Sequence, residues 1–284
     1  MYQRFEGSFR SFDSTRLFYQ GWEAKDTRAH VIITHGQGEH SECYARLVQA
    51  FEGQKISFWA WDLRGHGRSE GVRGHADSFH HYVRDYLQFI DRVLKRLDDH
   101  KPIFLVAHSM GALIQTLALL ERSQDEFSAQ ILSAPLFGVA LPVPAYKKVG
   151  AEWLEKLLPK LTLGNEITHD MLTRDPDIMR EFEKDPLRHN RISSGVYLGF
   201  IRAFTEVFER ASEIKLPTLF LCPEQDPVVD TSTTLALKDR WGTQDTKALV
   251  YGEGARHEMF NDTHRLTVYR DLQDYLKARM KEPK

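Results

Sequence analysis

The chain has little of what marks disulfide-stapled, membrane-spanning or nucleic-acid-binding proteins. Its 284 residues include two cysteines, Cys43 and Cys222, which excludes a disulfide framework or a cysteine-rich zinc site. No stretch approaches the ~18 consecutive apolar residues that a membrane-spanning helix needs. A formal net charge of -2 provides no general attraction for nucleic acid. The first residues lack the apolar segment of a secretory signal, so we expect a soluble, cytoplasmic protein.

Internal repeats and metal-ligand patterns are missing as well. The 13 histidines are scattered through the sequence rather than grouped at ligand spacing. The one adjacent pair, His80 and His81, would point in two directions on a helix, so we interpret it as surface. We therefore expect no metal site.

Short apolar runs alternate with helix-period segments along most of the chain. The runs are His30–Thr34, Ile56–Trp61, Ile103–Ala107, Ala129–Ala134, Thr218–Cys222 and Lys247–Tyr251. A hairpin with strands at Phe9–Phe12 and Arg16–Trp22 is expected before them, and amphipathic helices are expected over about 79–94 and 263–280. This alternation predicts an α/β fold, with a mostly parallel central sheet and helices on both faces.

The alternation lapses between about residues 139 and 211. This stretch has helical fragments separated by prolines and no apolar run of comparable strength. Trp153, Leu154, Leu157 and Leu158 fall on one side of a predicted helix over 146–158. We predict one domain over residues 1–284, with an inserted helical cap at about 139–211 above the carboxyl ends of the strands. An ordinary core-packing helix is the alternative for any single fragment.

The candidate nucleophile is Ser109. It follows the run Ile103–Ala107 and precedes a helical pattern, which is the strand–turn–helix setting of a serine on a sharp elbow. Such an elbow crowds the backbone, so the residues two before and two after the serine must be small. Gly111 meets this requirement fully, and Ala107 meets it less well.

A serine hydroxyl needs a neighbouring base, usually a histidine that a carboxylate orients. In the hydrolases whose serine stands on this kind of strand–turn–helix elbow, the three residues follow in the chain order nucleophile, acid, base. Two histidines, His257 and His264, lie beyond the run Thr218–Cys222. His257 lies in a glycine-rich loop after the last strand, whereas His264 begins the last helix. We predict His257 as the base.

The acid is expected in the loop that follows Thr218–Cys222. Asp226 is our candidate, because a carboxylate at a strand end can reach the histidine. Glu224 and Asp230 are alternatives from the same loop, and Asp230 also has the position of a helix N-cap. For the oxyanion, we expect the backbone N–H of Met110, at the start of the helix, and that of Gln37, in a glycine-rich loop after an early strand.

Together these motifs resemble the monoacylglycerol lipase and lysophospholipase group of α/β-hydrolases. The matching segments are His35-Gly36-x-Gly38-Glu39-His40-Ser41, Asp62-x-Arg64-Gly65-His66-Gly67-x-Ser69, His108-Ser109-Met110-Gly111, and Asp226-Pro227-Val228 followed by His257. The likeness spans about residues 8–280. It implies a serine esterase without a cofactor, with Gln37 and Met110 forming the oxyanion hole. It also implies a cap whose apolar tunnel holds one acyl chain.

The resemblance further implies that Glu39 contacts the substrate head group, with a structural hydrogen bond as an equal alternative. Trp153, in the cap, is the other candidate substrate contact. The chain departs from the group where Cys43 stands at a position that these lipases often give to an arginine near the head group. Ala107 and Ala112 replace glycines of the elbow, and a proline replaces a common glycine ahead of the acid.

We predict a carboxylic-ester hydrolase acting on a lipid with one long acyl chain, either monoacylglycerol or lysophospholipid, through an acyl-enzyme on Ser109. The amphipathic segment 146–158 also predicts transient contact of the cap with a membrane surface. A short-chain carboxylesterase and an aminopeptidase-type hydrolase on the same fold are alternatives. A non-catalytic binding protein of this fold is a further one, although such proteins usually lose a triad member.

Overall fold

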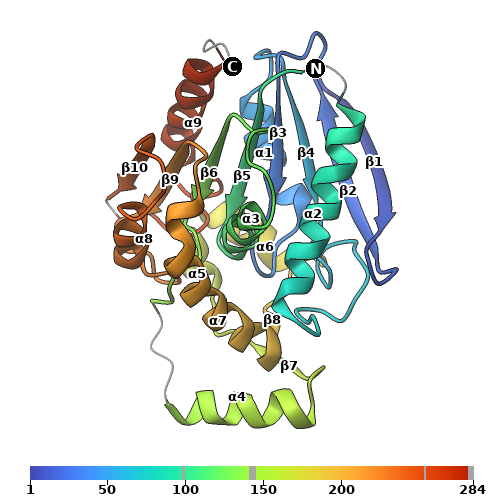
Figure 1. Ribbon diagram of the computed structural model, residues 1–284, viewed down its shortest axis with the longest axis vertical. Coiled ribbons are helices and arrows are strands. Elements are labelled where there is room, and N and C mark those ends of the chain that lie inside the picture. The colour runs from blue at the N-terminus through green and yellow to red at the C-terminus, as the bar shows by residue number, and fades with distance from the viewer. Residues whose placement is uncertain (98–99, 141–144, 253, 281–284) are drawn as a thin grey trace.

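Within residues 1–97, 100–140, 145–252 and 254–280, which the computed structural model describes, eight strands form one central sheet (Figure 1). Side chains are described for the same residues except 145–149 and 152. The strand order is β1-β2-β4-β3-β5-β6-β9-β10. The strands are β1 (Gln3–Arg10), β2 (Arg16–Glu23), β3 (Ala29–Thr34), β4 (Ile56–Trp61), β5 (Ile103–His108), β6 (Ala129–Ser133), β9 (Thr218–Pro223) and β10 (Thr246–Tyr251).

The sheet is mostly parallel, as predicted. The strands β3, β4, β5, β6, β9 and β10 run in one direction, and β2 pairs antiparallel with both β1 and β4. The hairpin forms with Arg10 opposite Arg16. Its first strand begins at Gln3 rather than at Phe9, because this edge strand alternates exposed polar residues and shows no apolar run. In β3, β4 and β5 every residue is buried, which is typical of a sheet that is covered on both faces.

Helices cover both faces of the sheet. Those outside residues 139–211 are α1 (Ala45–Ala50), α2 (Phe79–Arg96), α3 (Met110–Leu120), α8 (Thr231–Lys238) and α9 (Arg265–Arg279), with short 3-10 turns at Ser41–Tyr44 and Ala211–Glu213. Figure 1 shows α2 and α3 in front of the sheet and α1 behind it. The α9 helix lies against α1, because the Gln273 amide donates to the Ala50 carbonyl at 2.7 Å. No helix among the described residues is long and apolar enough to cross a bilayer.

Between β6 and β9 the chain forms a separate group of elements. They are α4 (Ala145–Leu157), β7 (Thr162–Gly164), α5 (His169–Leu172), α6 (Pro176–Lys184), β8 (Arg191–Ser193) and α7 (Ser194–Arg210). Figure 1 shows α4 at the end of the molecule farthest from both termini, beyond the carboxyl ends of the parallel strands. The α7 helix packs on α2 and α3 of the core and also contacts α4.

One feature of this group was not expected. The strands β7 and β8 pair antiparallel, with Thr162 opposite Ser193. The sequence did not predict them, since three residues are too few to show a period of two. Residues 141–144, inside the predicted cap, lie outside the described residues. The single domain with cap boundaries at about 139–211 stays a prediction.

Candidate active site

Ser109 stands on a strained turn between β5 and α3. Its backbone has φ 50° and ψ -120°, a conformation that residues other than glycine rarely adopt. The turn is crowded, because a Cβ at Gly111 would lie 2.4 Å from the carbonyl oxygen of His35 and 2.5 Å from that of Thr34. The turn is held by hydrogen bonds on both sides, from Ser109 N–H to the Ser133 carbonyl at 3.0 Å and from Leu136 N–H to the Ser109 carbonyl at 3.1 Å. The elbow that the sequence predicted is present.

The structure brings Ser109, His257 and Asp226 into one chain of contacts. His257 Nε2 lies 2.9 Å from Ser109 Oγ, and His257 Nδ1 lies 2.8 Å from Asp226 Oδ2. Because a carboxylate only accepts, Nδ1 carries the proton and Nε2 faces the hydroxyl as an acceptor. The second oxygen of Asp226 accepts the N–H groups of Val228 at 2.8 Å and Val229 at 3.2 Å, which fixes the carboxylate.

The three side chains come from loops at the same edge of the sheet. Ser109 follows β5, Asp226 follows β9 and His257 follows β10, and in a parallel sheet these carboxyl ends lie together. The side chains of His257 and Asp226 are 4% and 0% exposed, so their interaction is shielded from water. Burial acts to lower the pKa of His257, but the Asp226 carboxylate raises it, and the net shift is upward.

The other candidates for acid and base have different partners. Asp230 is the N-cap of α8, where its carboxylate accepts the N–H of Ser232 at 2.9 Å. Glu224 is exposed. His264 Nδ1 lies 3.4 Å from Asp262 Oδ2 and 3.1 Å from the Arg174 guanidinium, so its contacts are part of another cluster.

The loop that carries Gln37 lies directly against the serine. A Cβ at Gly36 would be 3.0 Å from Ser109 Cβ, and one at Gly38, where φ is 79°, would be 2.2 Å from the carbonyl oxygen of His189. Glycine is therefore required for the chain to pass this closely. The side-chain amide of Gln37 donates to the carbonyl of Arg191 at 2.7 Å.

Glu39 shapes this loop from inside. It is 2% exposed, and its Oε1 accepts the N–H of Gly36 at 2.5 Å and the hydroxyl of Tyr44 at 3.0 Å. Burial, followed by the nearby Glu258 carboxylate, raises the pKa of Glu39 to about 8. These contacts favour the structural alternative for Glu39, although the residue also lines the cavity above Ser109.

A cavity of about 510 Å³ opens above Ser109 between the core and the cap. Its acidic lining residues are Glu39, Glu183, Asp185 and Glu258, its guanidinium belongs to Arg188, and its apolar residues are Ile167, Leu172 and Phe182. Trp153 is not among the residues that line it. That side chain is 64% exposed on α4. The described lining is therefore polar near the serine, with a small apolar wall from the cap.

Arg188 is a site residue that the sequence analysis missed. It extends from the cap, lies 3.7 Å above the ring of Phe182 and forms an ion pair with the buried carboxylate of Glu258. Its guanidinium is also 3.2 Å from Cys43 Sγ. The chain thus places a guanidinium beside Cys43, but from 145 residues away. Such an origin leaves no local signal in the sequence.

One group of side chains has ligand types suited to a metal. The ligand atoms of His40, Cys43 and Asp185 lie within 4.8 Å of one another. However, His40 Nε2 is hydrogen-bonded to Asp185 at 2.7 Å, and the Arg188 guanidinium contacts the sulfur. Burial also raises the pKa of Cys43, so the thiolate that a metal requires is disfavoured. We assign no metal to this group.

Comparisons with known proteins place these features in context. A family profile described as "Serine aminopeptidase, S33" matches residues 25–264. The monoglyceride lipase of Homo sapiens is 31% identical over 275 residues, which cover 94% of this chain and 88% of the human protein. The monoacylglycerol lipase of Mycolicibacterium smegmatis is 29% identical over 277 residues, covering 96% and 97%. The crystal structure of a monoacylglycerol lipase from Paleococcus ferrophilus superposes with a TM-score of 0.80 at 26% identity, covering 98% and 99%.

Proposed function

The chain belongs to the monoacylglycerol lipase group of the α/β-hydrolase superfamily, and we propose that it hydrolyses single-chain lipid esters through a triad of Ser109, His257 and Asp226. Membership of this group makes it a serine ester hydrolase that acts on lipid esters. The observation that carries the proposed triad is the unbroken chain of contacts from Ser109 Oγ through His257 to Asp226, at 2.9 and 2.8 Å.

In the proposed mechanism, Ser109 Oγ attacks the ester carbonyl while His257 Nε2 takes its proton. His257 then gives this proton to the departing alcohol, and an acyl-enzyme remains. A water molecule then attacks the acyl carbonyl, again with His257 as the base, and the fatty acid is released. Asp226 stabilises the imidazolium that forms in both halves and keeps the proton on Nδ1.

The oxyanion is proposed to bind to the backbone N–H groups of Gln37 and Met110. Met110 is the first residue of α3, so the positive end of the helix adds to its N–H. Gln37 follows Gly36, whose N–H is held by Glu39, and this bond supports the loop in its place against the serine. Losing one such donor typically costs about 10²–10³ in turnover.

The charges around the cavity favour a neutral head group. The carboxylates of Glu183, Asp185 and Glu258 line it, whereas Glu39, with a pKa of about 8, is mostly neutral at pH 7. The guanidinium in the lining, Arg188, is already paired with Glu258. A phosphate group would face mainly carboxylates, whereas the hydroxyl groups of glycerol can donate hydrogen bonds to them. Of the two expected substrates, monoacylglycerol is therefore the better fit, and lysophospholipid is the poorer one.

The same carboxylates support a second candidate function. A peptidase that removes N-terminal residues needs acidic side chains for the amine of its substrate, and Glu183, Asp185 and Glu258 line the cavity that also contains Ser109. The description of the family that matches the chain also names an aminopeptidase. This candidate predicts cleavage of amino-acid arylamides.

The outer surface of the cap supports a contact with lipid aggregates. The exposed apolar side chains between residues 153 and 163 are Trp153, Leu157, Leu158, Leu161 and Leu163. Apolar side chains that gather at one end of a protein are typical of surfaces that meet membranes or other proteins. We expect Trp153→Glu to slow hydrolysis of micellar substrate while leaving a soluble short ester unaffected. If Trp153→Glu hydrolysed both substrates at the wild-type rate, and the wild-type protein did not float with liposomes, this contact would be excluded.

The deciding experiment compares initial rates on monoacylglycerol, lysophosphatidylcholine, a short p-nitrophenyl ester and an amino-acid p-nitroanilide. Ser109→Ala serves as the blank and is expected to lose several orders of magnitude in turnover without unfolding. We expect monoacylglycerol to be the fastest substrate. Faster cleavage of the anilide would identify the peptidase, activity on the short ester alone would identify a small-ester esterase, and activity retained in Ser109→Ala would refute the assigned nucleophile.

A further inference from the structure

The loop that carries His257 is bonded to a segment of the cap. The His257 N–H donates to the Met171 carbonyl at 3.3 Å, and the Glu258 N–H donates to the Leu172 carbonyl at 2.9 Å. The next cap residue, Thr173, donates its hydroxyl to the Asn261 carbonyl at 2.9 Å. The candidate base therefore lies in a loop whose backbone is paired with the cap and not only with the core.

Asp262 joins the two sides of this contact. Its side chain is fully buried, and Oδ1 accepts the N–H of the cap residue Arg174 at 2.7 Å. Its Oδ2 accepts the N–H of Arg256 at 3.2 Å, and Arg256 directly precedes His257. Burial acts to raise the pKa of Asp262, but these N–H donors lower it overall, so the carboxylate is charged at neutral pH. One carboxylate thus holds the residue before the base and the cap residue opposite it.

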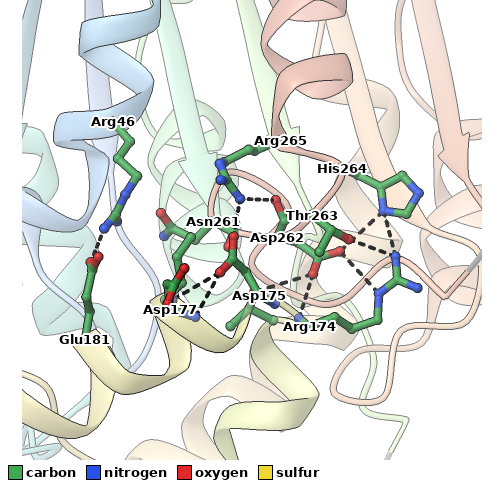
Figure 2. Close-up of polar contacts among 12 residues, drawn as sticks. Arg46, Arg174, Asp175, Asp177, Glu181, Asn261, Asp262, Thr263, His264 and Arg265 are labelled. Carbon is green, nitrogen blue, oxygen red and sulfur yellow. Dashed lines mark hydrogen bonds and ion pairs between the residues drawn. The ribbon is translucent and has the colours of Figure 1, made fainter.

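The side chain of Arg174 completes the cluster from the cap side (Figure 2). Its Nε lies 4.0 Å from Asp262 Oδ2, and its Nη2 donates to Thr263 Oγ1 at 2.9 Å. A Cβ at Gly254, in the same loop as His257, would lie 3.0 Å from Arg174 Nη1. The guanidinium therefore balances the buried charge and packs over the turn that leads to the base.

We propose that Asp262 is a positioning residue. It fixes the His257 loop relative to the cap segment 171–174 and so holds the base toward Ser109. The inference rests on the proposed function, since it assigns Asp262 a role in that reaction. Residues 252 and 254–264, which the structure describes between β10 and α9, form no helix or strand, so their side-chain positions depend on such anchors. A displacement of the base by about 1 Å is enough to lower turnover about 100-fold.

A second connection between cap and core offers a matched control. Arg46, on α1, forms an ion pair with Glu181 on α6, and Figure 2 shows this pair apart from the Asp262 cluster. Among the described residues, neither Arg46 nor Glu181 forms a hydrogen bond or ion pair with the His257 loop. Arg46→Ala therefore loosens the cap without touching the proposed anchor.

The test measures kcat and KM on monoacylglycerol for Asp262→Asn, Asp262→Ala and Arg46→Ala, with active sites counted by titration. Titration corrects for any protein that fails to fold. We expect kcat per active site to fall about 10- to 100-fold in Asp262→Ala, with KM changing less than kcat. Asp262→Asn keeps one acceptor oxygen and is expected to recover part of the loss. Arg46→Ala is expected to keep the wild-type kcat.

A fluorophosphonate that labels the serine gives a readout that does not depend on the lipid substrate. We expect its labelling rate constant to fall in the order wild type, Asp262→Asn, Asp262→Ala. Unchanged kcat and labelling rates in both Asp262 variants, or an equal loss in Arg46→Ala, would overturn the inference. If the wild type is labelled but hydrolyses no lipid ester, the proposed function fails while the labelling series still decides the role of Asp262.

Discussion

Replacing Asp226 by asparagine tests the triad most directly. The change keeps the shape of the side chain, and its oxygen can still accept the N–H groups of Val228 and Val229. The amide nitrogen then faces His257 Nδ1 at the place where Asp226 Oδ2 lies 2.8 Å away. Because two donors cannot face each other, the proton of the neutral imidazole moves to Nε2, and the ring can no longer accept the proton of Ser109.

The expected loss has two parts. The imidazolium loses a carboxylate at a charge separation of about 4 Å, which is worth about 4 kcal/mol at an effective dielectric constant of about 20. At about 1.4 kcal/mol for each factor of ten, this corresponds to roughly 10³ in turnover. The wrong tautomer adds to it, so we expect kcat to fall by about 10⁴, as is typical of this change in Ser-His-Asp enzymes.

The pH profile supplies an independent signature. As a base His257 must be neutral, so kcat/KM falls as the pH drops through its pKa. The carboxylate of Asp226 raises that pKa against the effect of burial, and the Glu258 and Glu39 carboxylates also raise it. Removing Asp226 is therefore expected to move the acidic limb of the profile to lower pH.

Two carboxylates of the same loop serve as controls. Asp230→Asn keeps a good N-cap on α8, and Glu224→Gln changes an exposed side chain, so both are expected to retain wild-type kcat. The assay is steady-state hydrolysis of monoacylglycerol from about pH 5 to 9, with thermal unfolding to verify the fold. A kcat of Asp226→Asn within tenfold of wild type, or a large loss in Asp230→Asn, would refute the assignment.

Two further predictions concern stability. Gly111→Ala would bring a methyl group to 2.4 Å from the carbonyl oxygen of His35, so we expect unfolding to become easier by about 1–3 kcal/mol in denaturant titration. Gly150 is a helical site with no neighbour within 4 Å, so Gly150→Ala is expected to stabilise the folded protein slightly. Equal effects of Gly111→Ala and Gly150→Ala on the free energy of unfolding would contradict the steric crowding at Gly111. The pKa of Glu39 is raised from 4.5 to about 8, so the folded state loses stability as the pH rises through this window. Glu39→Gln should flatten the dependence of Tm on pH between about 5 and 8. A slope equal to that of wild type would argue that ionisation of Glu39 does not destabilise the folded state.

Much of the sheet could be predicted from the sequence because its signals are local. Each parallel strand is a short apolar run between turn residues, and the predicted ends lie within one residue of those in the structure. The short strands β7 and β8 and the early start of β1 escaped, because three-residue strands and polar edge strands carry no apolar period.

The contacts of the site were beyond what local patterns can reveal. The Arg188 guanidinium reaches Cys43 across 145 positions of the chain. Asp262 looks like an ordinary polar residue ahead of the last helix, yet it is fully buried and binds backbone groups of Arg174 and Arg256. Buried polar groups must find partners wherever the fold offers them, so their roles follow from packing and not from the residues beside them.

What the sequence by itself determined is the chemistry that the chain can offer. Residue type and strand-end position were enough to propose Ser109, Asp226 and His257 as a triad, since a parallel sheet brings the carboxyl ends of its strands to one edge. Only the tertiary structure decided which atoms meet. In it, the Gly36 N–H donates to Glu39, Arg188 forms an ion pair with Glu258, and the His257 loop is hydrogen-bonded to the cap. Distances between segments far apart in sequence arise from the packing of the whole chain, and no local pattern contains them.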